Sequence, residues 1–211
     1  MNDELVFYTH PQSRGRTIRW MLEEIGRPYR TEILGYGQNM KAEPYLSINP
    51  MGKVPAITHG GTPVTEVAAI CAYLADAFPD ARLAPPSGSR ERGPYYRWLF
   101  FTAGPVESAM FAKLLRFEVP TEQERAVGYG TMGQVLDTLE GAVADRPHLA
   151  GDAFTAADLY VAAFLGFGML FGGIEKRPAF ETFVGRHMAR PAAVRAREID
   201  DAAMPEQPAA S

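Results

Sequence analysis

The chain changes character near residue 80, and this change limits the folds open to it. Before this point strand and helix signals alternate, and after it only helical patterns follow. The predicted elements are a strand at 4–8, a helix from Ser13 to Ile25 and a strand at 29–34, followed by a turn and strand at 49–58, a hairpin turn at 59–61 into a short strand at 62–64, and a helix at 65–78. This βαβ–ββα order predicts a mixed four-stranded sheet with helices packed on it, an α/β fold followed by an all-α part.

A segment rich in Pro, Gly, Ser and charge separates the two parts. We therefore predict an N-terminal domain at residues 1–80, a linker at 81–89 and a helical domain at 90–211. The last residues, from 204 onward, are expected to form a frayed tail.

Composition narrows the classes of function. The formal net charge of the 211 residues is -4, which argues against broad binding to nucleic acid or to an anionic membrane surface. The start has no basic and apolar leader, so we expect no signal peptide, and the apolar run at 159–174 is too short to span a bilayer. The single cysteine, Cys71, cannot form an internal disulfide and fits a reducing cytoplasm. His59, His148 and His187 share no metal-ligand spacing, so we expect no metal.

The predicted helix behind Ser13 has an unusual charge pattern. Arg14, Arg16 and Arg19 crowd its first turns, although a helix start carries partial positive charge and favours acids. Plain alternatives are an N-cap role for Ser13 and a solvent-exposed pair between Arg19 and Glu23. The acid of a capping box is missing, however, because Arg16 occupies its position. We expect this helix start to receive an anion, best a ligand thiolate to which Ser13 donates, since helix N-termini and hydrogen bonds lower a thiol pKa.

Two further segments offer groups to a ligand. Val54–Pro55 lies in a strand-like stretch, where proline requires an edge position or a cis bond. Either arrangement leaves the Val54 backbone able to pair with an extended peptide, while an ordinary edge-strand proline is the plainer alternative. Glu66 lies in the first turn of a predicted helix capped by Thr65. Amides there would hold a ligand carboxylate and Glu66 its ammonium group, unless Glu66 merely balances the helix dipole.

Together these stretches resemble the cytosolic glutathione transferase family, in a serine-type branch of bacterial character. The resemblance covers nearly the whole chain and rests on four stretches in order: YTHPQSRGRTIRWMLEE (8–24), INPMGKVPAI (48–57), TEVAAICAYLADAFP (65–79) and GDAFTAADLYVAA (151–163). It implies a thioredoxin-like first domain with a cis Val54–Pro55 bond, an all-helical second domain, a homodimer, and glutathione as co-substrate.

The same resemblance implies roles for single residues. Ser13 would activate the glutathione thiol and Val54 would pair with the cysteinyl part of the tripeptide. Glu66 and Val67 would grip its γ-glutamyl end, while Lys53 and, by a weaker match, Lys41 would reach the rest of the ligand. The family usually has Glu-Ser where this chain has Glu66–Val67, so one hydroxyl bond is lost and we expect weaker glutathione binding. Thiol activation could instead fall to Thr9, His10, Arg14 or a backbone amide.

The second part of the chain offers a folding signal and a candidate pocket. Thr155 and Asp158 form a capping box with Phe154 and Leu159 as a hydrophobic staple, and we assign this box to structure. The helical pattern at 95–117 is expected to kink at Pro105. By the resemblance it lines the electrophile pocket, with an apolar wall of Phe100, Phe101, Pro105 and Met110, although plain core packing is the alternative.

The function implied is conjugation of the glutathione thiolate to an apolar electrophile. Alternatives on the same fold are a glutathione-dependent peroxidase, isomerase or dehalogenase, or a non-catalytic dimer that binds apolar ligands. A thiol–disulfide reductase is disfavoured, because Ser13 stands where such chemistry requires a cysteine.

Overall fold

The computed structural model describes residues 3–204, which form two compact units. The first contains the N-terminal residues up to Leu74 together with the segment that begins at Pro191, and the second contains residues 75–190. The sequence predicts a single helical domain from residue 90 onward, whereas the structure groups the last helix with the N-terminal elements. The tail expected beyond residue 204 lies outside the described residues.

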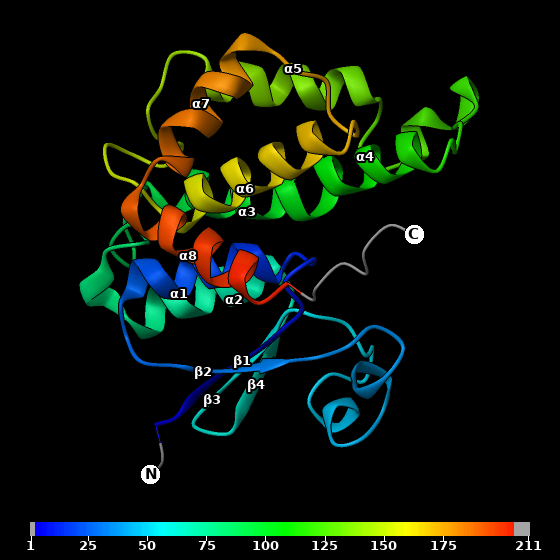
Figure 1. Cartoon of the computed structure of the whole chain (residues 1–211). Coiled ribbons are helices and arrows are strands. Elements are labelled where there is room, and N and C mark those ends of the chain that lie inside the picture. Colours follow the sequence, from blue (N-terminus) through cyan, green and yellow to red (C-terminus); the bar gives the residue numbers. More distant parts are fainter. Residues whose placement is uncertain (1–2, 205–211) are drawn as a thin grey trace. The chain divides into compact units, whose positions relative to one another are not determined.

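The first unit is built on a four-stranded sheet in the order β2-β1-β3-β4. β1 (Leu5–Thr9) pairs in parallel with β2 (Arg30–Ile33) and antiparallel with β3 (Ala56–His59), which pairs antiparallel with β4 (Thr62–Thr65). α1 (Gly15–Ile25), α2 (Val67–Ala77) and α8 (Pro191–Ala202) lie on one side of this sheet (Figure 1). The predicted mixed sheet is therefore confirmed.

The local chemistry of α1 and α2 explains where they begin and end. Three apolar residues of α1, Ile18, Met21 and Leu22, are at most 1% exposed, as the helical period predicts. The helix stops at Gly26, whose left-handed φ of 67° lets its N–H reach the Leu22 carbonyl at 3.0 Å. The predicted N-cap at Thr65 is wrong, because Thr65 still belongs to β4 and α2 begins two residues later.

The second unit is helical. Its long elements are α3 (Arg92–Phe101), η4 (Thr102–Val106), α4 (Glu107–Leu114), α5 (Met132–Val143), α6 (Ala156–Leu170) and α7 (Pro178–Met188). η4 is a π-helical stretch inside the continuous α3–α4 helix. Pro105, where the sequence predicts a kink, lies within this stretch and has no N–H to donate to the helix. None of the helices in the described part of the chain combines the length and the apolar character that a membrane span requires.

Short helical turns complete the chain. Two of them, η1 (Asn39–Lys41) and η2 (Tyr45–Ser47), belong to the first unit, and η3 (Pro79–Ala81) and η5 (Thr121–Ala126) belong to the second. In Figure 1, η1 and η2 form a separate lobe of loop beside the sheet, ahead of β3.

The capping box at the start of α6 is confirmed. Asp158 is fully buried, and its Oδ2 accepts hydrogen bonds from the Thr155 N–H and hydroxyl, each at 2.8 Å. Its Oδ1 accepts from the Leu149 N–H at 2.7 Å, which ties the preceding loop to the helix. Burial raises the pKa of this carboxyl. The flanking Phe154 and Leu159 are buried too, which agrees with the structural role assigned to the box.

A buried ion pair holds α8 against α1. Arg19 Nε donates to Asp200 Oδ1 at 3.1 Å, and the two side chains are only 3% and 1% exposed. The Arg19 guanidinium also donates to Thr31 Oγ1 at 2.8 Å and to Tyr29 Oη at 3.2 Å. The solvent-exposed pairing of Arg19 with Glu23 that the sequence allowed is therefore wrong. The pair instead explains why the last helix belongs to the first unit.

Replacing Asp200 by alanine tests this pair. The substitution leaves the Arg19 charge buried without its carboxylate, which should lower the free energy of unfolding by about 3–5 kcal/mol. Denaturant unfolding measures the loss. Arg195→Gln is the matched control, because it breaks the Arg195–Glu23 pair between the same two helices, in which Arg195 is 52% exposed, and it should cost less than about 1 kcal/mol. Equal stability of the two variants would contradict the role given to Asp200.

Candidate functional site

Three segments singled out in the sequence meet at one edge of the sheet. Tyr8 of β1 pairs with Ala56 of β3, and Ala56 pairs in turn with Thr65 of β4. Just beyond this row, β1 and β4 end and β3 begins. The residues next to the row on these three segments are Thr9 to Ser13, Val54 with Pro55, and Glu66 with Val67.

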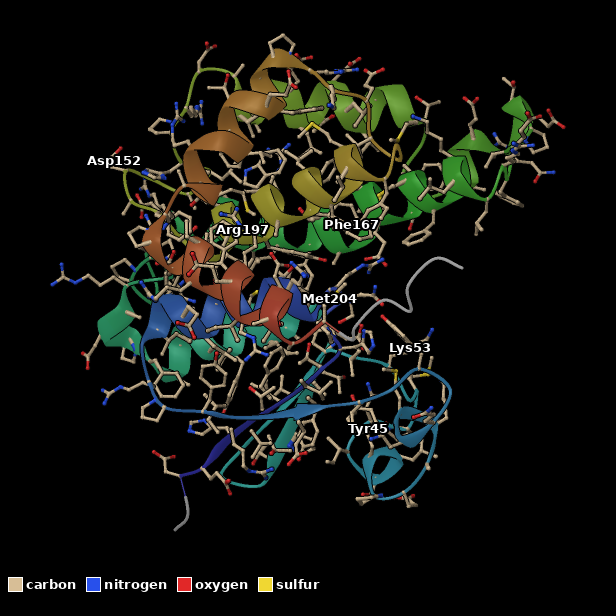
Figure 2. All side chains as sticks on the ribbon, viewed as in Figure 1. Tyr45, Lys53, Asp152, Phe167, Arg197 and Met204 are labelled. Atoms are coloured by element: carbon tan, nitrogen blue, oxygen red, sulfur yellow. The ribbon has the colours of Figure 1, made fainter. Side chains whose placement is uncertain are left out.

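The lobe that precedes β3 is anchored by an apolar cluster and two polar side chains. Tyr45 is buried, its ring centre lies 5.5 Å from that of Tyr8, and its hydroxyl donates to the Lys53 carbonyl (Figure 2). Asn49, which is 4% exposed, donates to the same carbonyl at 2.9 Å. These contacts fix the backbone just before Val54–Pro55, whose peptide bond is cis as the resemblance implies. Sequence reasoning missed Tyr45 and Asn49, although a polar residue in a turn before a cis-proline is a usable signal.

Lys41 and Lys53 both belong to this lobe and are exposed. Lys41 Nζ donates to the Met51 carbonyl at 2.9 Å. A Cβ on Gly52 would lie 2.8 Å from Lys41 Cδ and from the Met40 carbonyl, and the φ of Gly52 is 54°. Only glycine fits this position, so the turn before β3 packs directly against Lys41.

Ser13 lies at the start of α1, half-buried, with both functions of its hydroxyl engaged. Its O–H donates to the His10 carbonyl at 2.7 Å, and its oxygen accepts from the Gly15 N–H at 2.9 Å. The second bond satisfies the N–H of the first helical residue, but Arg14 occupies the N-cap position, so Ser13 is not the N-cap that the sequence allowed. The first closes a tight turn from His10 to Ser13, since the Ser13 N–H donates to the same carbonyl at 2.9 Å.

Two of the arginines at this helix start are balanced by α8. Arg19 pairs with Asp200 in the core, and Arg16 Nη2 donates to Asp201 Oδ1 at 2.5 Å. Arg16 Nε donates at the same time to the Pro11 carbonyl at 2.6 Å. We expected these two cations to be balanced by a ligand anion, and that expectation is wrong. They are partnered by acids of the chain itself.

His10 and Thr9 surround the Ser13 turn. The His10 ring lies 4.3 Å from the ring of Tyr36, and its Nδ1 accepts from the Gln12 N–H at 3.1 Å, which leaves the proton on Nε2. Burial lowers the pKa of His10, so the ring is neutral at pH 7. A Cβ on Gly15 would lie 1.9 Å from Thr9 Oγ1, so the end of β1 and the start of α1 are in direct contact.

Glu66 is held in an uncommon backbone conformation. Its φ is 66°, in the left-handed region, and its carbonyl accepts the Ile70 N–H at 2.8 Å at the start of α2. Its side chain is exposed, whereas Val67 is 9% exposed and turns its apolar side chain inward. The sequence indicates Glu66 as a candidate ligand-binding acid. It does not predict the left-handed backbone conformation, because no local sequence pattern places a glutamate at positive φ.

The predicted apolar wall is only partly accessible. Phe100 is 65% exposed, Phe101 and Pro105 are half-buried, and Met110 is fully buried. A Cβ on Gly173 would lie 2.7 Å from Met110 Cγ, so the chain after α6 packs directly on α4. Sequence reasoning missed a group of exposed apolar residues at the ends of these two helices: Leu114, Leu115, Phe117, Leu170 and Phe171.

Two histidines that lie far apart in sequence come together with the capping-box acid. His148, Asp158 and His187 bring one potential ligand atom each within 4.8 Å of one another. These residues show no metal-ligand spacing in the sequence, but the fold brings them together. Two of the three residues, Asp158 and His187, already have hydrogen-bond partners within the protein. The Asp158 oxygens accept three protein donors, and His187 Nε2 faces the Pro147 carbonyl at 3.0 Å. We assign the cluster to the structure of the second unit.

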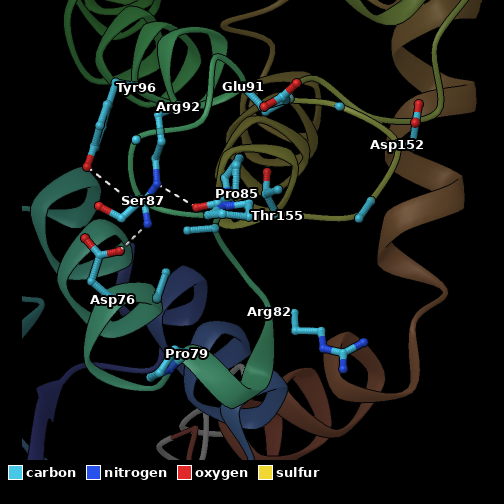
Figure 3. A pocket seen from close by; sticks show the side chains of 17 residues that line it. Asp76, Pro79, Arg82, Pro85, Ser87, Glu91, Arg92, Tyr96, Asp152 and Thr155 are labelled. Atoms are coloured by element: carbon cyan, nitrogen blue, oxygen red, sulfur yellow. Dashed lines mark hydrogen bonds and ion pairs between the residues drawn. The ribbon is translucent and has the colours of Figure 1, made fainter.

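Two other features involve none of the residues at this edge of the sheet. Cys71 is fully buried, and burial raises the pKa of its thiol to about 12, which confirms the inert cysteine expected from the sequence. A cavity of about 920 Å³ in the second unit lies between the linker and the loop before α6 (Figure 3). Arg92 spans its wall, donating to Asp76 at 2.6 Å and to the Pro85 carbonyl at 2.7 Å. This cavity contains none of the predicted site residues.

Comparisons with known proteins agree with this architecture. The family descriptions "Glutathione S-transferase, N-terminal domain" and "Glutathione S-transferase, C-terminal domain" match residues 13–77 and 99–191. The chain is 34% identical to glutathione S-transferase GstA of Escherichia coli O157:H7 over 122 residues, 57% of this chain and only 60% of that protein. It is 32% identical to the glutathione S-transferase-like protein tpcF of Aspergillus fumigatus over 196 residues, 81% of this chain and 84% of that protein.

A solved structure extends the similarity to the fold. The structure of a sphingomonad glutathione S-transferase complexed with glutathione matches 93% of this chain and 98% of its own, with a TM-score of 0.76 and 28% identity. The chain therefore belongs to the cytosolic glutathione S-transferase family, a family of enzymes with a thioredoxin-like domain and a helical domain.

The buried histidine of the second unit predicts a pH dependence of stability. Burial lowers the pKa of His187 from 6.5 to about 4. The unfolded chain therefore binds more protons than the folded chain between these values, and stability is lost as the pH falls through this window. The loss amounts to roughly 3 kcal/mol. In His187→Gln, whose amide can still donate to the Pro147 carbonyl, the loss on acidification should be smaller. Denaturant unfolding from about pH 7 to about pH 4 tests this, and equal pH slopes for the two proteins would contradict it.

Proposed function

We propose that this protein conjugates the thiolate of glutathione to an apolar electrophile, and that Ser13 stabilises the thiolate. The observation that supports this most is the row Tyr8–Ala56–Thr65, which gathers the Ser13 turn, Val54 and the Glu66–Val67 pair at one sheet edge. A helix N-terminus, an extended backbone and an acid are the three groups that a tripeptide with a thiol, a backbone and an amino-acid head group needs.

The thiolate is the anion proposed for the start of α1. A free thiol has a pKa of about 8.5, and lowering it by about two units corresponds to roughly 2.7 kcal/mol of preferential thiolate binding. Ser13 now donates to the neutral His10 carbonyl. A hydrogen bond to an ionised acceptor is about twice as strong as one to a neutral acceptor, so the hydroxyl turns to the sulfur when the thiolate arrives.

The remaining groups are assigned to the rest of the tripeptide. The Val54 backbone pairs with the cysteinyl residue, and Glu66 with the Val67 amide holds the γ-glutamyl end. Lys53 and Lys41 face the glycyl carboxylate from the lobe before β3. Because the Val67 side chain is buried and apolar, one hydroxyl bond to the ligand carboxylate is missing. The missing bond weakens glutathione binding by roughly 1.5–3 kcal/mol relative to a serine at this position.

Apolar surface in the second unit supports an apolar electrophile. Leu115 is 75% exposed, Phe117 66% and Leu170 77%, and such a concentration of exposed apolar side chains is typical of a binding surface. The ring of Phe167 on α6 (labelled in Figure 2) lies 4.7 Å from the ring of Phe171, which follows the helix, in a tilted arrangement. We propose that this group, with Phe100 and Phe101, receives the electrophile. We also propose a cytoplasmic homodimer, on the strength of the family resemblance and the single buried cysteine.

Ser13→Ala tests the proposal. Losing the donated proton should slow conjugation at neutral pH by at least about tenfold and raise the pKa of the bound thiol by about one unit or more. The pH profile of kcat/KM with a chlorodinitrobenzene as electrophile measures both effects. Ser47→Ala is the matched control, because the Ser47 hydroxyl makes the same kind of bond, to the Pro44 carbonyl three residues earlier, away from the helix start. An unchanged rate and profile in Ser13→Ala would move the role to a backbone amide or to Arg14.

Calorimetry separates conjugation from the rival, a non-catalytic dimer that binds apolar ligands. Titration with glutathione should give heat and raise the unfolding temperature of the protein. No heat and no thermal shift at millimolar glutathione would favour the rival. A panel of peroxide, dehalogenation and isomerisation substrates then distinguishes the remaining glutathione-dependent reactions from conjugation.

A further inference from the structure

We propose that Arg16 is a positioning residue for the thiolate site and that Asp201 of α8 holds Arg16 in this role. The inference rests on the proposed function, because it concerns the turn that places Ser13. Arg16 Nε donates to the Pro11 carbonyl at 2.6 Å, and its Nη2 donates to Asp201 Oδ1 at 2.5 Å. The C-terminal helix thus reaches the site turn through one side chain.

By binding the Pro11 carbonyl, Arg16 can hold the turn from His10 to Ser13 in place. Both the N–H and the hydroxyl of Ser13 donate to the His10 carbonyl, so Pro11 lies inside the closed turn. When the Ser13 hydroxyl rotates to a sulfur, one of these two bonds is given up. The contact from Arg16 remains, and it keeps the turn and the amides at the start of α1 in place while the hydroxyl moves.

The geometry of arginine suits this task. The guanidinium presents Nε and Nη2 in one rigid plane, so it can donate to a carbonyl and a carboxylate at once. A lysine has the same charge on one nitrogen and cannot span two acceptors with fixed geometry. Arg16 is 37% exposed and Asp201 57% exposed, so the pair contributes little to stability and its effect is on orientation.

A positioning role and a purely electrostatic role for Arg16 predict opposite effects on the pKa of the bound thiol when the Asp201 carboxylate is removed. If Arg16 acted on the sulfur only as a cation, removing the carboxylate would strengthen its field and lower the pKa of the bound thiol. If Arg16 acts by holding the turn, removing the carboxylate loosens the side chain and raises that pKa. Asp201→Asn keeps an oxygen that accepts from Arg16, so it should retain the orientation while losing the charge.

The experiment uses the full-length protein with glutathione and a chlorodinitrobenzene. We expect Asp201→Ala to raise the pKa of the bound thiol and to lower kcat/KM at neutral pH about three- to tenfold, with KM for the electrophile unchanged. Arg16→Lys should behave in the same way, and Asp201→Asn should return most of the activity and the profile. Thiol ionisation is followed by the ultraviolet absorbance of the thiolate, and thermal unfolding confirms that each variant is folded.

Arg195→Gln is the matched control, because Arg195 pairs with Glu23 across the same two helices but does not touch the turn. It should keep the original pH profile. A profile shifted to lower pH or unchanged in Asp201→Ala, or an equal shift in Arg195→Gln, would overturn the inference. Ser13→Ala in the same assay separates the two proposals. If the pH profile shifts in Ser13→Ala but not in Asp201→Ala, only the positioning role is overturned. If it shifts in Asp201→Ala but not in Ser13→Ala, only the role of the Ser13 hydroxyl is overturned.

Discussion

The buried pair between Arg19 and Asp200 is the constraint on which the first unit depends. A guanidinium removed from water is tolerated only when its charge and its donors are all satisfied. Here Asp200 supplies the charge, Thr31 and Tyr29 supply acceptors, and the Phe7 ring lies 5.0 Å from the guanidinium carbon. One side chain thereby joins α1 to two strands and to the last helix, so the start of α1, where the thiolate is proposed to bind, belongs to a rigid framework.

This constraint changes the meaning of the arginines that open α1. Read locally, cations behind a serine at a helix start indicate an awaited anion, because nothing nearby balances them. The acids that balance Arg16 and Arg19 lie 185 and 181 residues further along the chain. No periodicity or capping rule connects such positions, so sequence alone could not assign them. The anion site that remains is the one made by Ser13 and the backbone of the helix start.

Other parts of the structure could be predicted from the sequence because local residue patterns determine them. Strand and helix order followed from apolar periods, Gly26 and Thr155–Asp158 are local end signals, and Val54–Pro55 is a local backbone constraint. The N-cap at Thr65 was misplaced because the positive φ of Glu66, which inserts a residue between β4 and α2, has no local signature. The histidine cluster and the exposed apolar ends of α4 and α6 were missed because they arise only when distant segments meet.

The start of α1 is proposed to stabilise a thiolate with the Ser13 hydroxyl. A crystal structure of this protein with glutathione bound tests it most directly. We expect the sulfur to lie within hydrogen-bond distance of Ser13 Oγ, with the hydroxyl turned away from the His10 carbonyl and the Arg16 contact to Pro11 retained. A sulfur remote from Ser13 and from the neighbouring backbone amides would contradict it.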